Sequence, residues 1–248
     1  MWNFSRSGGG VGSVTVAGLA MTQGARPSIP LPTPEPLAPP GDFIARAAEL
    51  GVGLDAERAA KIGDYLARLI ATNALMNLTA ITDPEEAWSR HALDALSIAP
   101  EIPQGAAVVD VGSGGGVPAI PLAIARPDLR VTMVEATQKK AAFLAAVSSA
   151  LGLRGVTVRP ERAEALKKGA LRGSYDVATA RAVGKLALLV GLMAPLVKRG
   201  GKLVLIKGQR ADEELAEAKL AMFDHGVVHE RTVPTPTGRV VVLTRAGR

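Results

Sequence analysis

The residues best suited to chemistry in this chain follow one another at a glycine-rich turn. An apolar run, Ala106 to Val109, predicts a buried strand, and Asp110 stands where that strand should end. Four of the next six residues are glycines: Gly112, Gly114, Gly115 and Gly116. A segment with helical spacing follows. Because glycines lack Cβ atoms, a ligand can lie against bare backbone at the start of that helix.

The spacing of these glycines narrows the choice of ligand. Gly112 and Gly114 match the first two glycines of the dinucleotide fingerprint G-x-G-x-x-G, but Val117 occupies the third position. No Gly-Lys pair is followed by Ser or Thr, so the sequence has no Walker A loop. An acid followed by G-x-G-x-G resembles the first motif of Rossmann-like S-adenosylmethionine methyltransferases. Their cofactor carries an ammonium group and a positive sulfur, which suit Asp110. A glycine turn without a ligand is the alternative.

A second carboxylate follows the next predicted strand. Arg130 to Val134 is apolar at alternate positions, and Glu135 comes 25 residues after Asp110. Folds of this kind place a carboxylate near that distance to bind ribose hydroxyls. One carboxylate can accept two hydrogen bonds from a vicinal diol. We therefore expect Glu135 to bind a ribose, with a helix-capping role as the alternative.

The elements that must position these residues alternate along the chain. Three further strands are predicted at Val156–Arg159, Tyr175–Thr179 and Lys202–Ile206, and a closing pair at Val227–Val233 and Arg239–Thr244. Helices are predicted at Lys185–Val197 and Ala211–Phe223. Strands that alternate with helices predict an α/β fold: a mostly parallel, seven-stranded Rossmann-like sheet with helices on both faces. Ligands bind at the carboxyl ends of such strands. Polar or glycine residues fall at five of these ends: Asp110 and Gly112, Glu135, Ala163 and Glu164, Arg181, and Lys207.

Three regions are expected. Residues 1–41 are predicted to be a disordered extension, because seven of the fourteen residues from Pro27 to Pro40 are proline. Residues 42–103 form an N-terminal helical addition, with helices predicted at 42–50 and 55–76 and from Asp83 onward. Residues 104–248 form the S-adenosylmethionine-binding domain.

The composition limits the classes of function. The net charge of +6 suits a nucleic-acid partner, and 3% aromatic residues favour contacts to phosphates over base stacking. The chain has no cysteine and three scattered histidines, so we expect no metal site. No apolar run is long enough for a membrane span. We expect a cytoplasmic monomer.

Four stretches together resemble one family. They are Asn77-Leu78-Thr79-Ala80-Ile81, Arg90-His91-x-x-Asp94-x-Leu96, the Asp110–Pro121 loop and Thr179-Ala180-Arg181-Ala182-Val183. They look like the bacterial 16S ribosomal RNA guanine-N7 methyltransferases, the glucose-inhibited division protein B family. The resemblance covers roughly residues 42–248. It implies S-adenosylmethionine as cofactor and 16S ribosomal RNA, or the small ribosomal subunit, as partner.

The resemblance also implies site residues. The cofactor contacts of the family fall on Gly112, Val117, Ala163, Glu164 and Arg181. Val117 stands where the family often has Phe or Leu. Together with the residues argued above, the expected cofactor site is Asp110, Gly112, Gly114, Val117, Glu135, Ala163, Glu164 and Arg181. The expected RNA contacts are Arg90, His91, Lys139, Lys140 and Lys207.

No dedicated catalytic residue is expected. Guanine N7 carries a free lone pair, so no proton must leave before attack and no general base is needed. The enzyme must align the reacting atoms, and Arg181 and His91 are the positioning candidates. Simpler roles are a packed histidine for His91 and a surface ion pair for Arg90 and Asp94 at helical i, i+4 spacing.

Two other functions remain open from the sequence. One is a non-catalytic RNA-binding protein on a methyltransferase-like fold. The other is an NAD(P)-dependent oxidoreductase, whose pyrophosphate would have to bind the loop despite Val117.

Overall fold

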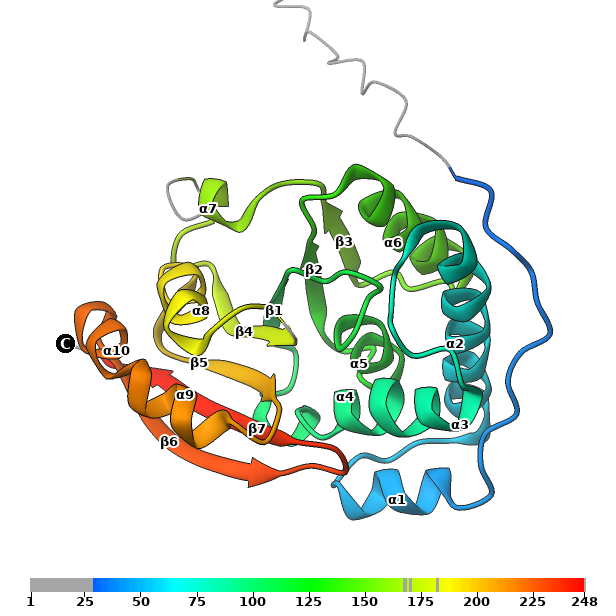
Figure 1. Ribbon diagram of the computed structural model, residues 1–248, viewed down its shortest axis with the longest axis horizontal. Helices are drawn as coiled ribbons and strands as arrows, with labels where there is room; N and C mark the ends of the chain where they lie inside the picture. Colours follow the sequence, from blue (N-terminus) through cyan, green and yellow to red (C-terminus); the bar gives the residue numbers. More distant parts are fainter. Residues whose placement is uncertain (1–28, 167–168, 170, 182, 248) are drawn as a thin grey trace, which may run out of the picture.

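A seven-stranded sheet forms the centre of the molecule, in the order β3-β2-β1-β4-β5-β7-β6 (Figure 1). The computed structural model describes residues 29–166, 169, 171–181 and 183–247. The strands are β1 Ala107–Val111, β2 Arg130–Val134, β3 Val156–Arg159, β4 Tyr175–Arg181, β5 Val197–Lys207, β6 Val227–Pro234 and β7 Arg239–Arg245. Strands β1 to β5 pair in parallel, and β7 is antiparallel to both β5 and β6. The expected fold class is confirmed.

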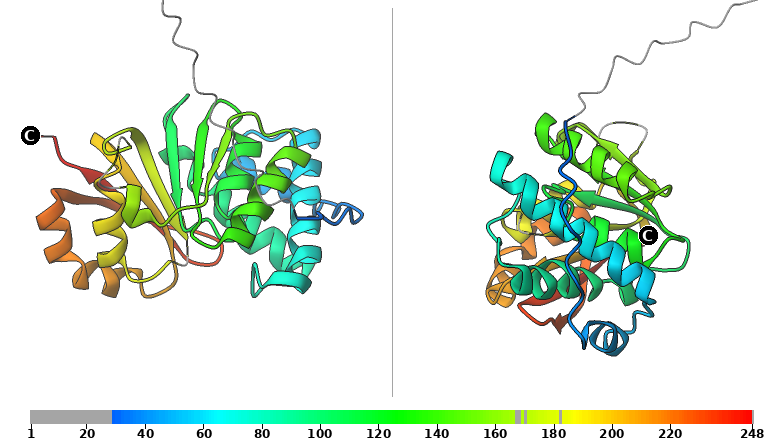
Figure 2. Two further views of the ribbon diagram at one scale, coloured as in Figure 1. Left: turned by 90° about the horizontal axis from the view of Figure 1, so that it is seen from above. Right: turned by 90° about the vertical axis from the view of Figure 1, so that its right-hand side faces the viewer.

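Side-chain alternation along the strands builds two apolar cores, one on each face of the sheet. Figure 2 shows the helices that cover these two faces. Val108 of β1 belongs to the core with α2 (Ala56–Met76), α5 (Ala119–Ala125) and α6 (Gln138–Ala150). Val109, the next residue, belongs to the core with α8 (Leu186–Met193), α9 (Ala211–Glu217) and α10 (Lys219–His225). Because successive residues of a strand face opposite sides, β1 and its neighbours are buried on both faces.

The N-terminal helical addition shares the first of these cores. Its elements are α1 (Phe43–Glu49), α2, α3 (Pro84–Ala87), a π-helical turn η1 (Trp88–Leu93), α4 (Asp94–Leu96) and a 3₁₀ turn η2 (Ala99–Glu101). The start predicted at Asp83 is confirmed, and the Asp83 carboxylate accepts a hydrogen bond from the Glu86 N–H. The π-helical turn was not predicted. Such turns occur mostly as single wide turns inside helices and are frequent at functional sites.

The segment Ile29–Gly41 differs from the expectation of a disordered extension. It runs beside α2 (Figures 1 and 2), and Ile29, Leu31 and Leu37 pack against the core. The Leu37 N–H donates to the Gly63 carbonyl at 3.2 Å. This segment packs because its few aliphatic side chains, spaced between prolines, meet an apolar face of α2. Residues 1–28 of the expected extension lie outside the described residues.

Two helix predictions near the C-terminus were wrong in their limits. A helix was predicted over Lys185–Val197, but α8 ends at Met193 and β5 begins at Val197. A buried apolar run does not by itself distinguish helix from strand. The helix predicted over residues 211–223 is divided at Ala218 into α9 and α10.

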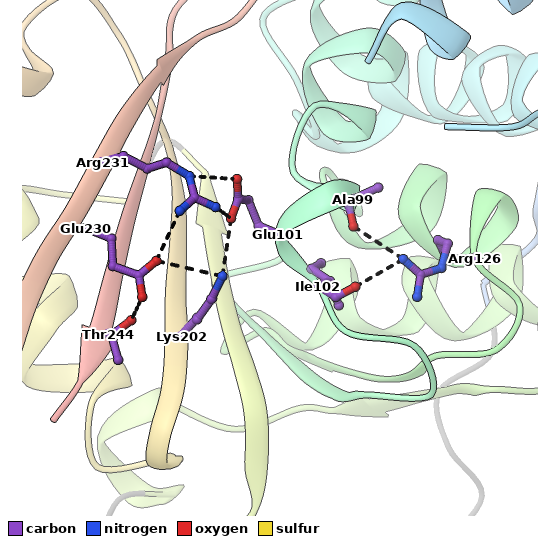
Figure 3. A network of polar contacts seen from close by, with 8 residues as sticks. All are labelled: Ala99, Glu101, Ile102, Arg126, Lys202, Glu230, Arg231 and Thr244. Atoms are coloured by element: carbon purple, nitrogen blue, oxygen red, sulfur yellow. Dashed lines mark hydrogen bonds and ion pairs between the residues drawn. The ribbon is translucent and has the colours of Figure 1, made fainter. Parts of the chain in front are cut away.

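A network of charges joins the helical addition to the C-terminal strands (Figure 3). The Glu101 carboxylate of η2 accepts from the Arg231 guanidinium of β6 and lies 3.4 Å from Lys202 Nζ of β5. The Glu101 side chain is only 10% exposed. On its other side, Arg126 donates to the carbonyls of Ala99 and Ile102 at 3.3 and 3.2 Å. These contacts hold the end of the helical addition against the sheet edge.

Candidate functional site

The glycine-rich turn between β1 and α5 is held from two sides. The Tyr65 hydroxyl of α2 donates to the Gly115 carbonyl at 2.9 Å. The Gly114 N–H donates to Glu135 Oε2 at 2.9 Å, which ties the turn to the end of β2. A Cβ on Gly112, where φ is +73°, would lie 2.6 Å from Val183 Cγ2. Glycine is therefore required at Gly112 both by conformation and by space.

A cavity of about 590 Å³ opens over this turn, and we call it the glycine-loop cavity. Eight residues expected in the site line it: Arg90, His91, Gly112, Gly114, Val117, Glu135, Lys140 and Arg181. The sequence Thr79-Ala80-Ile81 contributes a further wall. The volume of the glycine-loop cavity lies within the usual range for small-ligand sites. The structure thus gathers residues from β1, β2, β4 and the helical addition around one space.

Asp110 is buried beside the turn rather than lining the cavity. Its Oδ1 accepts from the Thr179 hydroxyl at 2.8 Å, while its Oδ2 has no hydrogen-bond partner within the described part of the chain. Burial raises the pKa of Asp110 to about 6. A buried carboxylate oxygen without a partner is costly, and a ligand ammonium group would offset that cost. The unpartnered carboxylate oxygen of Asp110 therefore fits the positively charged methionine part of S-adenosylmethionine.

Glu135 stands at the end of β2 with an 8% exposed side chain. Its two oxygens accept from the N–H groups of Gly114 and Thr137 at 2.9 and 2.8 Å. A carboxylate offers about four acceptor positions, so two remain for a ligand diol. This arrangement fits the ribose of the cofactor.

His91 fixes the position of Arg181. Arg181 Nη1 donates to His91 Nδ1 at 3.0 Å, so Nδ1 is unprotonated and the imidazole hydrogen is on Nε2, 2.8 Å from the Thr79 hydroxyl. Burial, together with the neighbouring Arg181, lowers the pKa of His91 to about 3. His91 is therefore a neutral acceptor at physiological pH. It also joins the Asn77–Ile81 stretch to the end of β4.

The remaining predicted contacts do not line the glycine-loop cavity. Ala163 and Glu164 lie in α7 (Ala163–Leu166), where Glu164 is exposed, and Lys139 is an exposed residue of α6. Lys207 lines a second, smaller cavity and its Nζ lies 2.8 Å from Glu214 Oε2. The roles of these four residues stay predictions.

The suggested ion pair between Arg90 and Asp94 was wrong. Arg90 Nη1 pairs with Glu86 Oε1 at 2.7 Å, and Asp94 accepts from the N–H and hydroxyl of Thr237. The intervening π-helical turn is wider than an α-helical turn, which shifts the i, i+4 register of an α-helix. Among the described residues, no group of three His, Asp or Glu side chains could hold a metal ion. Among the residues that the structure describes, no helix is both long enough and apolar enough to cross a membrane.

Sequence reasoning missed Tyr65, Thr79, Thr179 and Val183 as residues of the site. Tyr65 lies at a core position of an amphipathic helix, and its signal was its hydroxyl, since a buried tyrosine needs a hydrogen-bond partner. Burial raises its pKa. Thr179 precedes Arg181 by two residues in β4, so it shares the face that Arg181 takes. Thr79 lay within the recognised Asn77–Ile81 stretch, but its hydrogen bond with His91 was not predicted.

The strand order, the glycine turn after β1 and the carboxylate after β2 define a Rossmann-like, S-adenosylmethionine-dependent methyltransferase. Solved structures agree on the fold. A SAM-dependent methyltransferase from Aquifex aeolicus matches 66% of this chain and 94% of its own, at 18% identity and a TM-score of 0.53. A SAM-dependent O-methyltransferase from Thermotoga maritima matches 73% of this chain and 72% of its own, at 18% identity and a TM-score of 0.51.

Sequence comparison identifies the family. The protein-family model described as rRNA small subunit methyltransferase G (GidB) matches residues 58–240. The Sorangium cellulosum protein named Ribosomal RNA small subunit methyltransferase G is 56% identical over 225 residues, which are 90% of this chain and 94% of that protein. A Staphylococcus aureus protein of the same name is 44% identical over 162 residues, covering 64% of this chain and 67% of its own. The chain belongs to the rRNA small subunit methyltransferase G family.

Proposed function

We propose that this protein transfers a methyl group from S-adenosylmethionine to N7 of a guanine in 16S ribosomal RNA. The observation that carries the proposal is the glycine-loop cavity, which brings the glycine turn, Glu135 and Arg181 together in a member of this family. A ribosomal substrate locates the reaction in the cytoplasm.

The chemistry of N7 suits the residues of the cavity. When bound, S-adenosylmethionine supplies a methyl group whose bond to sulfur breaks as the guanine N7 lone pair bonds to the carbon, with the electron pair left on sulfur. Both ring nitrogens of His91 are engaged, with Arg181 and Thr79, so this imidazole is not free to accept a proton. Methylation at N7 requires no such acceptor, whereas methylation of an exocyclic amine does.

The proposed roles of the cofactor-site residues follow from their positions. Gly112 and Gly114 admit the cofactor to the backbone, Glu135 accepts from its ribose hydroxyls, and Asp110 balances the positive charge of its methionine part. Arg181, fixed by His91, positions the reacting groups from the end of β4.

The proposed division of the chain assigns RNA contacts to both parts. Residues 42–103 supply Arg90 at the mouth of the cavity, and residues 104–248 bind the cofactor and supply Lys139 and Lys140. These side chains would contact phosphates and fix the position of the RNA. Phosphate contacts by themselves do not distinguish one base sequence from another. We propose that one chain suffices for the reaction.

Family membership disfavours both alternatives. An oxidoreductase would need room for a pyrophosphate at Val117, and a non-catalytic RNA-binding protein would have no use for a cavity that ends in a ribose-binding carboxylate.

The test is methyl transfer from tritiated S-adenosylmethionine to small-subunit RNA, and to small ribosomal subunits, that lack the modification. We expect label in one guanine, and chain cleavage under conditions specific for 7-methylguanosine. Replacing that guanine with 7-deazaguanine should abolish the label. Label at another atom, or no transfer to either substrate, would refute the proposal.

A further inference from the structure

A second cavity of about 330 Å³ lies beside the glycine-loop cavity, over the carboxyl ends of β4 and β5. The two cavities share Arg90 and Arg181 as wall residues. Arg181 uses one of its five N–H donors, toward His91, and the others have no partner within the described ranges. A cofactor in the first cavity and an acceptor base in the second would thus meet at Arg181.

Charges of both signs line the second cavity. Lys207 is 8% exposed, and its Nζ donates to the Gly184 carbonyl at 2.9 Å and pairs with Glu214 Oε2 at 2.8 Å. A lysine ammonium has three donors, so one remains. Glu214 Oε2 also accepts from the Leu186 N–H at 2.8 Å. Glu214 Oε1 has no partner in the described part of the chain, and Glu214 lines the cavity.

The far side of this cavity is closed by a contact between the helical addition and the turn between β6 and β7. Thr237, in the turn between β6 and β7, donates its N–H and hydroxyl to Asp94, whose side chain is 1% exposed. Asp94 is therefore satisfied by the protein. Glu214 is left as the carboxylate with an acceptor oxygen available to a ligand.

We infer that the second cavity receives the acceptor guanine and that Glu214 selects guanine by accepting a hydrogen bond from its N1–H or N2 amino group. The inference rests on the proposed function. Guanine presents hydrogen-bond donors at N1 and N2, whereas adenine presents an acceptor at N1 that a carboxylate repels. Lys207 and Arg181 carry donors suited to guanine O6. Of the two purines, guanine alone presents N1–H and N2 donors beside a carbonyl oxygen, and it therefore matches a carboxylate acceptor that lies next to ammonium and guanidinium donors.

Glu214→Gln tests this role with little change of shape. Lys207 and the Leu186 N–H are both donors toward the same oxygen, so they keep the amide oxygen of Gln and turn its NH₂ group toward the cavity. The carboxylate acceptor is then replaced by a donor. Glu213→Gln is the matched control, because Glu213 lies on the same helix and pairs with the exposed Arg210 outside the cavity.

The assay compares RNAs that carry guanine, inosine or 2-aminopurine at the target position. Inosine lacks only the N2 amino group, and 2-aminopurine lacks N1–H together with O6; both retain N7. We expect the wild-type protein to methylate at least one analogue about tenfold or more slowly than guanine. In Glu214→Gln, guanine methylation should fall by a similar factor and the penalty for that analogue should largely disappear. Affinity for S-adenosylhomocysteine and the behaviour of Glu213→Gln should match wild type.

Three results would overturn the inference. Glu214→Gln could leave guanine methylation unchanged, or slow all three RNAs by one factor, which would reveal a structural role for the Lys207 pair. Wild-type protein that methylates the guanine RNA without discriminating against either analogue would also refute it. A wild-type protein that methylates none of the RNAs would instead refute the proposed function, and the inference with it.

Discussion

Replacing Gly114 with alanine adds one methyl group to the wall of the glycine-loop cavity. Gly114 has φ +54°, and a Cβ built on it lies 3.9 Å from its nearest neighbour, the Gly112 carbonyl oxygen. The methyl group therefore fits the protein but takes space from a ligand. The left-handed backbone costs an alanine about 1–2 kcal/mol, which lowers Tm by roughly 2–8 °C in a chain of this size.

Gly105→Ala separates this backbone strain from the effect on the ligand. Gly105 has φ +68°, and nothing lies within 4 Å of its Cβ position. Both variants should lose a similar amount of Tm, measured by thermal unfolding. Only Gly114→Ala should bind S-adenosylhomocysteine more weakly, by about 5- to 150-fold in titration calorimetry, since an inserted methyl group costs about 1–3 kcal/mol. Wild-type affinity in Gly114→Ala would show that the cofactor does not approach this turn, and would refute the site.

Four other features yield predictions. Affinity for S-adenosylmethionine should rise between about pH 5 and 7, because the Asp110 pKa is raised to about 6 and a bound ammonium group favours the ionised carboxylate. Asp110→Asn should flatten this pH profile in titration calorimetry, and an unchanged slope would contradict the role of Asp110 in binding the cofactor. His91→Phe removes the acceptor of Arg181 and should lower kcat/KM for RNA about tenfold or more; steady-state methylation at the wild-type rate would exclude it as a positioning residue. Tyr65→Phe leaves the Gly115 carbonyl unpaired, so urea denaturation should show a loss of about 1–3 kcal/mol in the free energy of unfolding, and no loss would mean that water replaces the hydroxyl. A chain that begins at residue 42 should unfold at a lower temperature than one that begins at residue 29, because it loses the packing of Leu37 and its neighbours; equal Tm values would show that this packing adds nothing.

The strand ends of the site could be predicted from the sequence because local patterns determine them. Each of β1 to β5 contains a short run rich in apolar or β-branched residues near its carboxyl end, and parallel pairing brings the ends of such runs to one edge of the sheet. Asp110, Gly112, Glu135 and Arg181 were therefore expected at one edge, and the cavity lies there. The absence of Ser or Thr after any Gly-Lys pair excluded a Walker A loop without reference to any tertiary contact.

The contacts that hold the site together could not be predicted, because they join residues far apart in the chain. Tyr65 meets Gly115 across 50 positions and Arg181 meets His91 across 90. The π-helical turn that carries His91 has no local signature in Trp88–Leu93, whose residues would also suit an α-helix. The packing of Leu37 on α2 was missed for a related reason, since proline-rich composition describes the segment and not the surface that it meets.

The last strand of the sequence, β7, lies inside the sheet, between β5 and β6. During synthesis, the edge of β5 that faces away from β4 therefore remains unpaired until β7 is available to fill it. Any message truncated before residue 239 produces a chain that cannot fill this gap and presents an open strand to other chains. Completion of the sheet thus depends on the last of its strands in sequence order, and any fragment that lacks β7 exposes the edge of β5.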